Sequence, residues 1–200
     1  MSQSSTLAQG AALTPETWAD FVARLHHDCV GEGVRDHYTA DAVFLVQKRV
    51  KVYCMEGHDG EAFEIYFPGD AETYSAAERY DRLDGDDQQR LDAECPGIGF
   101  LSASMYDQIN ALGEVCPGDD VHEYNWGWET VNQHFTKAAA EAFIKRKAHD
   151  YRDGLRVWVD ASTYSWELNT IKAAILSGRL GLIHETETPG APHANELYVS

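Results

Sequence analysis

The stretch DAVFLVQKRVKVYCM, residues 41–55, indicates the fold more directly than any other part of the sequence. It is rich in β-branched and aromatic residues, and its side chains alternate in polarity over much of its length, which is typical of a strand. The segment AFEIYFP at 62–68 predicts a second strand, and EGHDGE between the two predicts a turn. We therefore expect 41–55 and 62–68 to pair as a long hairpin.

Helical patterns lie on both sides of this expected hairpin. LTPETWADFVARLHHDC, residues 13–29, predicts a helix with Thr14 as its N-cap and Pro15 at the first helical position. Residues 73–112 predict three shorter helices, the last of which is capped by Ser102.

The C-terminal half alternates between strand and helix patterns. Residues 121–135 predict a strand, Thr136 is the expected cap of the helix that follows, and LRVWVD at 155–160 predicts another strand. STYSWELNTIKAAILSG at 162–178 predicts a last helix, and LGLIHE at 180–185 an edge strand. The side chains expected on the buried face of the last helix are Tyr164, Leu168, Ile171 and Ile175.

The order of these elements predicts the fold class. Because the strands are grouped, we expect an α+β fold, in which an antiparallel sheet of short strands is packed by several helices. Residues 1–13 are expected to be a flexible lead-in, and residues 187–200 a flexible tail. Between them we expect a single α+β domain over 14–186 with an acidic helical insert at about 70–114.

The charge of the chain is strongly negative and unevenly distributed. The formal net charge is -17, and residues 56–94 alone contain thirteen acids and three bases. A chain of this charge repels nucleic acid, whose phosphates are bound by Lys and Arg, and it also disfavours anionic membrane surfaces. No apolar run approaches the ~20 residues that span a bilayer. We expect a basic partner, no direct nucleic-acid binding and no membrane.

The cysteine pattern bears on the compartment. None of the four cysteines forms a CxxC pair, and the N-terminus lacks the basic and apolar regions of a secretory signal. Free thiols in a reducing cytoplasm are therefore expected in preference to two disulfides. The cysteines are Cys29, Cys54, Cys95 and Cys116.

The stretch YDRLDGDDQQRLDAEC, residues 80–95, holds the densest group of acids. It lacks the glycine and the ligand spacing of an EF-hand loop, so it does not predict a calcium site. A solvated helix surface is the simplest interpretation, and a surface that meets a basic protein, in imitation of nucleic acid, is the other. The candidate contact residues are Asp81, Asp84, Asp86, Asp87, Asp92 and Glu94.

Metal and cofactor sites are not indicated by any motif. His26 and His27 are adjacent on the predicted helix and point about 100° apart, so one helix does not bring both to one metal. Cys29 lies on the apolar stripe of that helix, which favours a core role. We expect no cofactor. The residues considered for a metal site are His26, His27, Asp28, Cys29, Asp36 and His37.

Two further constellations suggest chemistry that packing explains as well. Cys95 or Cys116 would pair with His122 or His134 in a Cys–His dyad, but no local feature activates either thiol. HEYNWGWE at 122–129 has the aromatic and acidic content of a sugar site, although two Trp residues at i and i+2 also fit one buried strand face.

One basic cluster, KRKAHDYRDGLR at 145–156, follows the helix capped by Thr136. We expect it to pair with the acidic segment, within the chain or between subunits, in preference to nucleic acid. A homodimer is compatible with such pairing.

Two blocks of the sequence resemble a family of small uncharacterised proteins encoded by tailed phages and prophages. They are TADAVFLVQKRVKVY and HFTKAAAEAFIKRKAHDYRDGLRVWVDASTYSWELNTIKAAIL, within roughly 36–55 and 120–176. The acidic middle segment is less similar, and Cys54 stands where relatives have Gly. The family brings no agreed catalytic residues, so none is carried over.

The resemblance implies an accessory, anti-defence function. Such proteins block host defences of the anti-CRISPR or anti-restriction type, whose targets present basic grooves for nucleic acid. We expect a non-enzymatic inhibitor that binds a basic host protein or nucleoprotein complex. A small metal- or Cys/His-dependent enzyme and a phage structural or assembly protein are the alternatives.

Overall fold

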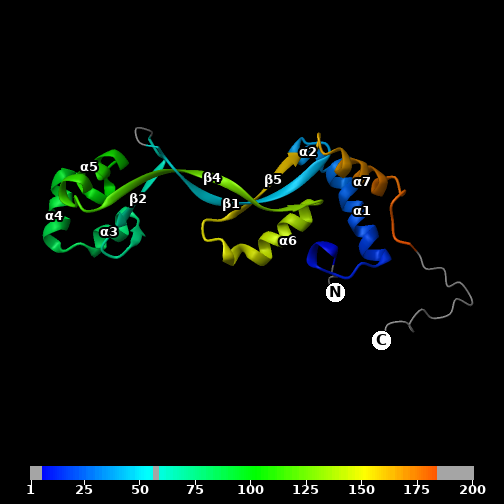
Figure 1. Ribbon diagram of the computed structural model, residues 1–200, viewed down its shortest axis with the longest axis horizontal. Coiled ribbons are helices and arrows are strands. Elements are labelled where there is room, and N and C mark those ends of the chain that lie inside the picture. Colours follow the sequence, from blue (N-terminus) through cyan, green and yellow to red (C-terminus); the bar gives the residue numbers. More distant parts are fainter. Residues whose placement is uncertain (1–5, 56–58, 184–200) are drawn as a thin grey trace, which may run out of the picture. The chain divides into compact units, whose positions relative to one another are not determined.

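The computed structural model describes residues 6–55 and 59–183 (Figure 1). The chain divides into two compact units, which we call the central unit, Lys48–Glu129, and the terminal unit, Met1–Gln47 with Thr130–Ser200. Two compact units in one chain can still unfold together, so the single domain expected over 14–186 stays a prediction. The tail expected over 187–200 lies outside the described residues.

The described strands form one five-stranded sheet in the order β3-β2-β4-β1-β5. The sheet is antiparallel, which confirms the expected α+β class. β1 has 12 residues and β4 has 15, close to the strands expected at 41–55 and 121–135, so the sheet contains two long strands beside its short ones. The strands are β1 (Ala42–Tyr53), β2 (Ala62–Phe67), β3 (Glu72–Tyr74), β4 (Asp120–His134) and β5 (Leu155–Ala161).

The expected hairpin between β1 and β2 is wrong, because β4 lies between them. β2 pairs with β4, where Glu64 is opposite His122, and on its other edge with β3, where Tyr66 is opposite Thr73. Thr73 thus lies in a strand and not at the start of a helix. β4 is long enough to accompany β1 along its whole length, which the six residues of β2 are not.

The terminal unit packs its helices on the first half of β1. The buried side chains of its core include Leu25, Phe44, Val46 and Ile175. Thr14 caps α1 and Thr136 caps α6, as the sequence predicts. α1 and α7 lie side by side (Figure 1). The helical elements are η1 (Leu7–Gln9), α1 (Pro15–Cys29), α2 (Val34–His37), α6 (Lys137–Lys147), η3 (Ala148–Asp150) and α7 (Trp166–Leu176).

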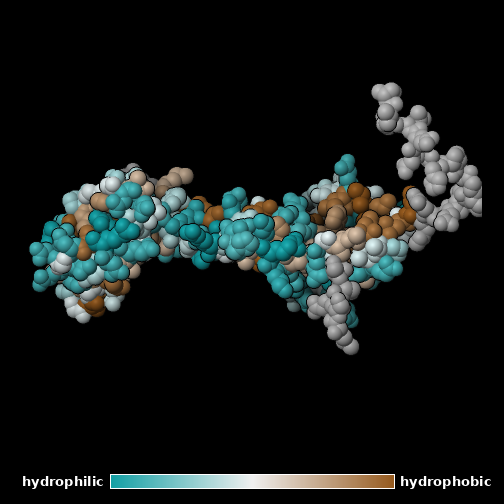
Figure 2. Space-filling model, turned by 90° about the horizontal axis from the view of Figure 1, so that it is seen from below, coloured by the Kyte–Doolittle hydropathy of each residue, from teal (hydrophilic) through white to brown (hydrophobic). Residues whose placement is uncertain are grey.

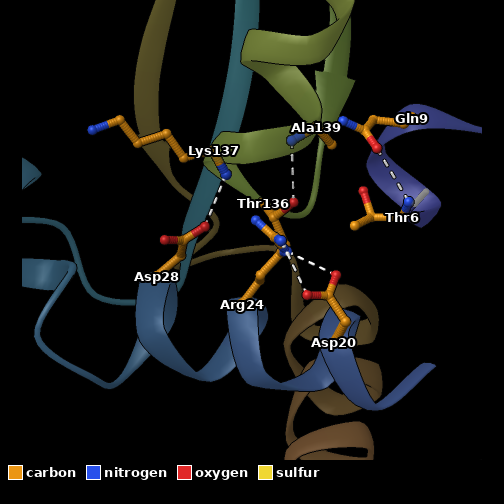
Figure 3. Close-up of polar contacts among 8 residues, drawn as sticks. All are labelled: Thr6, Gln9, Asp20, Arg24, Asp28, Thr136, Lys137 and Ala139. Atoms are coloured by element: carbon orange, nitrogen blue, oxygen red, sulfur yellow. Dashed lines mark hydrogen bonds and ion pairs between the residues drawn. The ribbon is translucent and has the colours of Figure 1, made fainter. Parts of the chain in front are cut away.

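A buried carboxylate joins α1 to α6. The Asp28 side chain, on the last turn of α1, accepts a hydrogen bond of 2.8 Å from the backbone N–H of Lys137 (Figure 3). The Thr136 hydroxyl accepts a second bond, from the N–H of Ala139. The first turn of a helix leaves four N–H groups without intrahelical partners, and two of those of α6 are satisfied in this way.

The buried face of α7 differs from the expected one. Tyr164 lies before the helix and is 92% exposed, and Ile171 is 46% exposed, whereas Lys172 is only 2% exposed. The Lys172 ammonium donates to the carbonyl of Asp41 at 2.8 Å and to the hydroxyl of Ser162 at 2.7 Å. The edge strand expected at 180–185 is absent from its described part, residues 180–183.

The central unit packs three helices against one face of β2 and β4. Its core contains Ile65, Leu91, Phe100 and Leu112. Ser104 caps the third helix and not Ser102, because the Ser104 hydroxyl accepts from the N–H at position 107. The helical elements are α3 (Ala76–Arg82), α4 (Gly85–Glu94), η2 (Phe100–Ser102) and α5 (Met105–Val115). No helix within the described ranges has the length and apolar character needed to cross a bilayer.

Candidate functional site

The six candidate acids lie on two consecutive helices of the central unit. Asp81 is on α3, Asp84 is the N-cap of α4, and the other four are on α4 itself. This part of the central unit presents mainly hydrophilic side chains (Figure 2). The helices expected in the acidic insert are therefore present, and the candidate residues follow one another along them.

Three of the six acids hold the local structure. Asp84 accepts from the N–H of Asp86 and of Asp87 at 3.1 and 2.9 Å, and Asp87 pairs with Arg90 at 2.8 Å. Asp92 accepts from the N–H of Phe100 at 2.9 Å and from the hydroxyl of Tyr80 at 2.8 Å. These two bonds, that from Phe100 first, lower the pKa of Asp92.

The other three acids face solvent. Asp81, Asp86 and Glu94 are exposed, and none makes a side-chain hydrogen bond or ion pair within the described structure. We call these three side chains the free acidic set. Their carboxylates are available to a partner without any loss to the fold.

The arginines of the acidic segment do not neutralise the free acidic set. Arg79 forms a buried two-point pair with Asp119, whose contacts are 2.7 and 3.0 Å. Arg82 lies 3.6 Å from Asp70, and Arg90 is bound to Asp87. Each of the three arginines of residues 56–94 thus has another carboxylate as its partner.

The basic cluster at 145–156 makes its contacts with other residues of the terminal unit. Arg146 donates to the carbonyl of Ala8 at 3.2 Å, and Lys147 pairs with Asp150 at 2.7 Å. Arg156 donates to Gln47 at 2.9 Å. These contacts lie in the terminal unit and do not involve the acidic segment.

The second face of the sheet in the central unit carries a pocket that the sequence did not indicate. Its volume is about 270 Å³, and side chains from four strands line it. Opposite residues of an antiparallel pair point to the same face, so the register of Glu64 with His122 and of Tyr66 with Thr73 gathers these groups. The lining residues are Tyr53, Glu64, Tyr66, Thr73 and His122. We call this cavity the sheet-face pocket.

Glu64 is the buried charged group of the sheet-face pocket. It is 5% exposed, and it accepts hydrogen bonds from the Lys51 ammonium and the Tyr53 hydroxyl. Desolvation acts to raise the pKa of Glu64, but the bonds from Lys51 and Tyr53 hold it below its ordinary value. The hydrogen bond to Glu64 raises the pKa of Tyr53. The carboxylate is therefore ionised at neutral pH.

The strand alternation separates the aromatic and acidic groups of HEYNWGWE. Trp126 is on the same face of the sheet as the sheet-face pocket. The guanidinium of Arg49 lies over its ring, with Cζ 3.9 Å from the ring centroid. Glu123 is opposite Phe63, which packs against the helix-covered core, and its carboxylate accepts from the N–H of Gly60. A sugar site built from Trp126 with Glu123 or Glu129 is therefore not assembled.

Four of the residues considered for a metal site make other contacts: His27, Asp28, Cys29 and His37. Asp28 binds the N-terminus of α6, and the ring of His27 lies 3.0 Å from its other oxygen. The Cys29 thiol is buried against the carbonyl of Ala42, and His37 packs edge-on against Phe44. No three ligand side chains converge on a point suited to a metal anywhere in residues 6–55 and 59–183.

The cysteines do not show the properties of nucleophiles. All four are free, and burial raises the pKa of Cys29, Cys95 and Cys116, which disfavours the reactive thiolate. The Cys54 sulfur accepts from the side-chain amide of Asn125.

The terminal unit contains other cavities, one of which, of about 350 Å³, is lined by residues of η1, α1, β4 and α6. An apolar groove of about 640 Å³ follows α1 and α7, and hydrophobic side chains gather over these helices (Figure 2). A polar cavity of about 310 Å³ lies beside Arg24. The Arg24 guanidinium donates two hydrogen bonds to the carboxylate of Asp20 (Figure 3). His26 is the one titratable side chain that lines the groove, so the groove offers packing surface and little chemistry.

The sequence pattern held one signal for the sheet-face pocket. In AFEIYF the single charged residue, Glu64, stands two positions before Tyr66, so a strand places both on one face. Which other strands complete that face depends on the pairing of β2 with β4.

Comparison of the chain with protein-family models, with curated proteins and with solved structures found no match.

Proposed function

We propose that this protein binds a basic partner protein through the acidic surface of α3 and α4. The free acidic set, Asp81, Asp86 and Glu94, makes the charged contacts. The observation that carries the proposal is that these carboxylates are exposed while the arginines of the same segment are paired elsewhere. Uncompensated carboxylates of this kind steer a basic partner into contact and align it.

The local structure supports such a contact because it holds the acidic surface in place. The cap at Asp84 and the bonds from Phe100 and Tyr80 to Asp92 fix both ends of α4. A pre-ordered surface loses less side-chain and backbone entropy on binding than a flexible acidic tail does.

The partner we propose is a host protein or nucleoprotein complex whose basic surface binds nucleic acid. The protein then acts as a phage- or prophage-derived inhibitor of the anti-CRISPR or anti-restriction type, in the host cytoplasm. The support for this finer proposal is the resemblance of two sequence blocks to phage-encoded proteins, together with the negative charge.

The test is capture of a partner from a nuclease-treated bacterial lysate, with identification by mass spectrometry. The triple variant Asp81→Asn, Asp86→Asn, Glu94→Gln should bind the identified protein about tenfold more weakly, since three surface charges contribute roughly 0.5 kcal/mol each. The wild-type affinity should also fall as salt is raised. DNA binding by the captured protein, followed by fluorescence anisotropy, tests inhibition.

The matched control changes three acids of the terminal unit. Glu141→Gln, Asp153→Asn and Glu167→Gln remove the same charge from exposed positions. The control should retain wild-type affinity. Equal weakening in both triple variants would mean that total charge and not the acidic surface governs binding, and equal capture by all three proteins would overturn the proposal.

A further inference from the structure

The sheet-face pocket is a built site that the acidic surface does not include. Glu64 is one of its lining residues and is largely removed from water, and the lining side chains come from β1, β2, β3 and β4. A buried charge is expensive unless it is paired, and Lys51 supplies that pairing, but the place of Glu64 in the lining of a pocket that opens to solvent also presents this carboxylate to a ligand of matching chemistry.

The lining of this pocket is acidic and aromatic. Glu64 is the one lining side chain with a formal charge when His122 is neutral, and the rings of Tyr53 and Tyr66 form walls. Asp120 lies opposite Tyr66 in the register, on the same face, and adds negative charge at the rim. Aromatic faces and carboxylates both attract cations.

Lys51 does not fill the pocket. Its ammonium is bound to Oε2 of Glu64 and lies 4.9 Å from the ring centroid of Tyr124, and Lys51 is not among the lining residues. The other oxygen, Oε1, accepts from the neutral hydroxyl of Tyr53. A carboxylate oxygen accepts two hydrogen bonds, so Glu64 retains capacity on Oε1.

We infer that the sheet-face pocket binds a primary alkylammonium group, carried by a lysine side chain of the basic partner. An ammonium has three donors, and the pocket offers it three groups with acceptor atoms: the Glu64 carboxylate, the Thr73 hydroxyl and the imidazole ring of His122. A cavity of about 270 Å³ matches one extended side chain and is smaller than most sites for larger ligands. The partner assignment rests on the proposed function, whereas the ammonium site itself does not.

The first experiment uses small probes and isotope-labelled full-length protein. We expect n-butylammonium to shift the NMR signals of the His122 and Tyr66 rings in a saturable manner. Butyltrimethylammonium, which has no N–H donors, and n-butanol, which has no charge, should shift them at least about fivefold more weakly. Equal binding of butyltrimethylammonium or of n-butanol would overturn recognition of a primary ammonium.

Variants separate the pocket from the rest of the surface. Glu64→Gln should weaken n-butylammonium binding roughly tenfold or more, and Thr73→Val about fivefold, the losses expected for a charged and a neutral hydrogen bond. Glu123→Gln is the matched control, because it makes the same change on the other face of β4. Thr73 is exposed, so its variant keeps the test valid if Glu64→Gln does not fold. Wild-type affinity in both pocket variants would refute the site.

A peptide pair tests the source of the ammonium. The probe is acetyl-Gly-Lys-Gly-amide, and its partner carries acetyl-lysine, which has no charge. We expect the lysine peptide to shift the same signals and the acetyl-lysine peptide not to. Binding of n-butylammonium without binding of the lysine peptide would overturn the partner side chain as the source.

The two proposals fail in different ways. Pocket variants that still bind the captured basic protein with wild-type affinity would exclude the partner's lysine from the sheet-face pocket and leave the acidic-surface contact standing. Saturable ammonium binding in a protein that captures no basic partner would overturn the proposed function and leave the pocket as a site for small amines.

Discussion

At the scale of single residues, three charged side chains that are buried among the described residues, Asp28, Glu64 and Lys172, distinguish this protein from a simple apolar core. Glu64 lies in the central unit, and Lys172 in the terminal unit, where it is surrounded by acceptors. Desolvation lowers the pKa of Lys172, while its ammonium donates to the carbonyl of Asp41 and the hydroxyl of Ser162. The Ser162 hydroxyl also bonds the side chain of Asn169, so Lys172 belongs to a network that joins α7 to the start of β1.

Loss of Lys172 should destabilise the protein strongly. In Lys172→Ala the carbonyl of Asp41 and the hydroxyl of Ser162 lose a buried donor, and the side-chain volume is lost too, so the free energy of unfolding should fall by about 2–4 kcal/mol. Lys145→Ala, at an exposed position on α6, should change it by less than about 0.5 kcal/mol. Urea unfolding followed by circular dichroism measures both. Similar values for the two variants would show that the network does not stabilise the fold.

Lys172 also shows what residue patterns miss. The apolar side chains at Leu168, Ile171 and Ile175 predict a buried stripe that leaves a lysine outside, yet the structure exposes much of Ile171 and buries Lys172. The burial of a lysine depends on acceptors supplied by Asp41 and Ser162, one far away in sequence and one just before the helix. Local periodicity contains no information about the distant one.

At the scale of elements, the starts of α1 and α6 were predictable and the strand partners were not. Thr14 and Thr136 mark the starts of α1 and α6 in the sequence because a cap acts within three residues. The pairing of β2 with β4 joins Glu64 to His122, which are separated by 58 positions, and no local signal chooses it over pairing with β1. The sheet-face pocket depends on that choice, so its composition was not predictable.

The hydrogen bond from the Lys137 N–H to Asp28, which joins α6 to α1, should contribute measurably to the free energy of unfolding. Asp28→Ala removes the acceptor of the Lys137 N–H and leaves the bond between Thr136 and Ala139 in place. The substitution should lower the free energy of unfolding by about 1–3 kcal/mol. Asp36→Ala removes the same charge from an exposed position in the terminal unit and should change it by less than about 0.5 kcal/mol. Thermal or urea unfolding distinguishes them. An Asp28 variant as stable as the Asp36 variant would contradict a capping role.

At the scale of the whole molecule, the described residues form two hydrophobic cores, and each lies within one unit. Ile65 and Leu91 belong to the core of the central unit, and Leu25 and Phe44 to that of the terminal unit. The sequence predicts a single domain over 14–186 and does not divide its apolar residues between two cores, because that division follows from tertiary packing.

The two cores should open separately. Leu91→Ala should lower the free energy of unfolding by about 2–5 kcal/mol and should speed amide hydrogen exchange mainly in α3, α4 and α5. Leu25→Ala should speed amide hydrogen exchange mainly in α1, α6 and α7. Exchange measured by mass spectrometry on both variants makes the comparison. Uniform loss of protection in all helices after either change would instead support the single domain predicted over 14–186.

The pairing of β1 with β4 brings the two ends of the acidic segment together. The backbone N–H of Cys54, one residue past β1, donates to the carbonyl of Glu123 at 2.9 Å. The entropy cost of closing a chain between two neighbouring positions rises only slowly with the number of residues between them. The segment between Cys54 and Glu123 should therefore tolerate changes of length and charge while the pairing of β1 with β4 is kept.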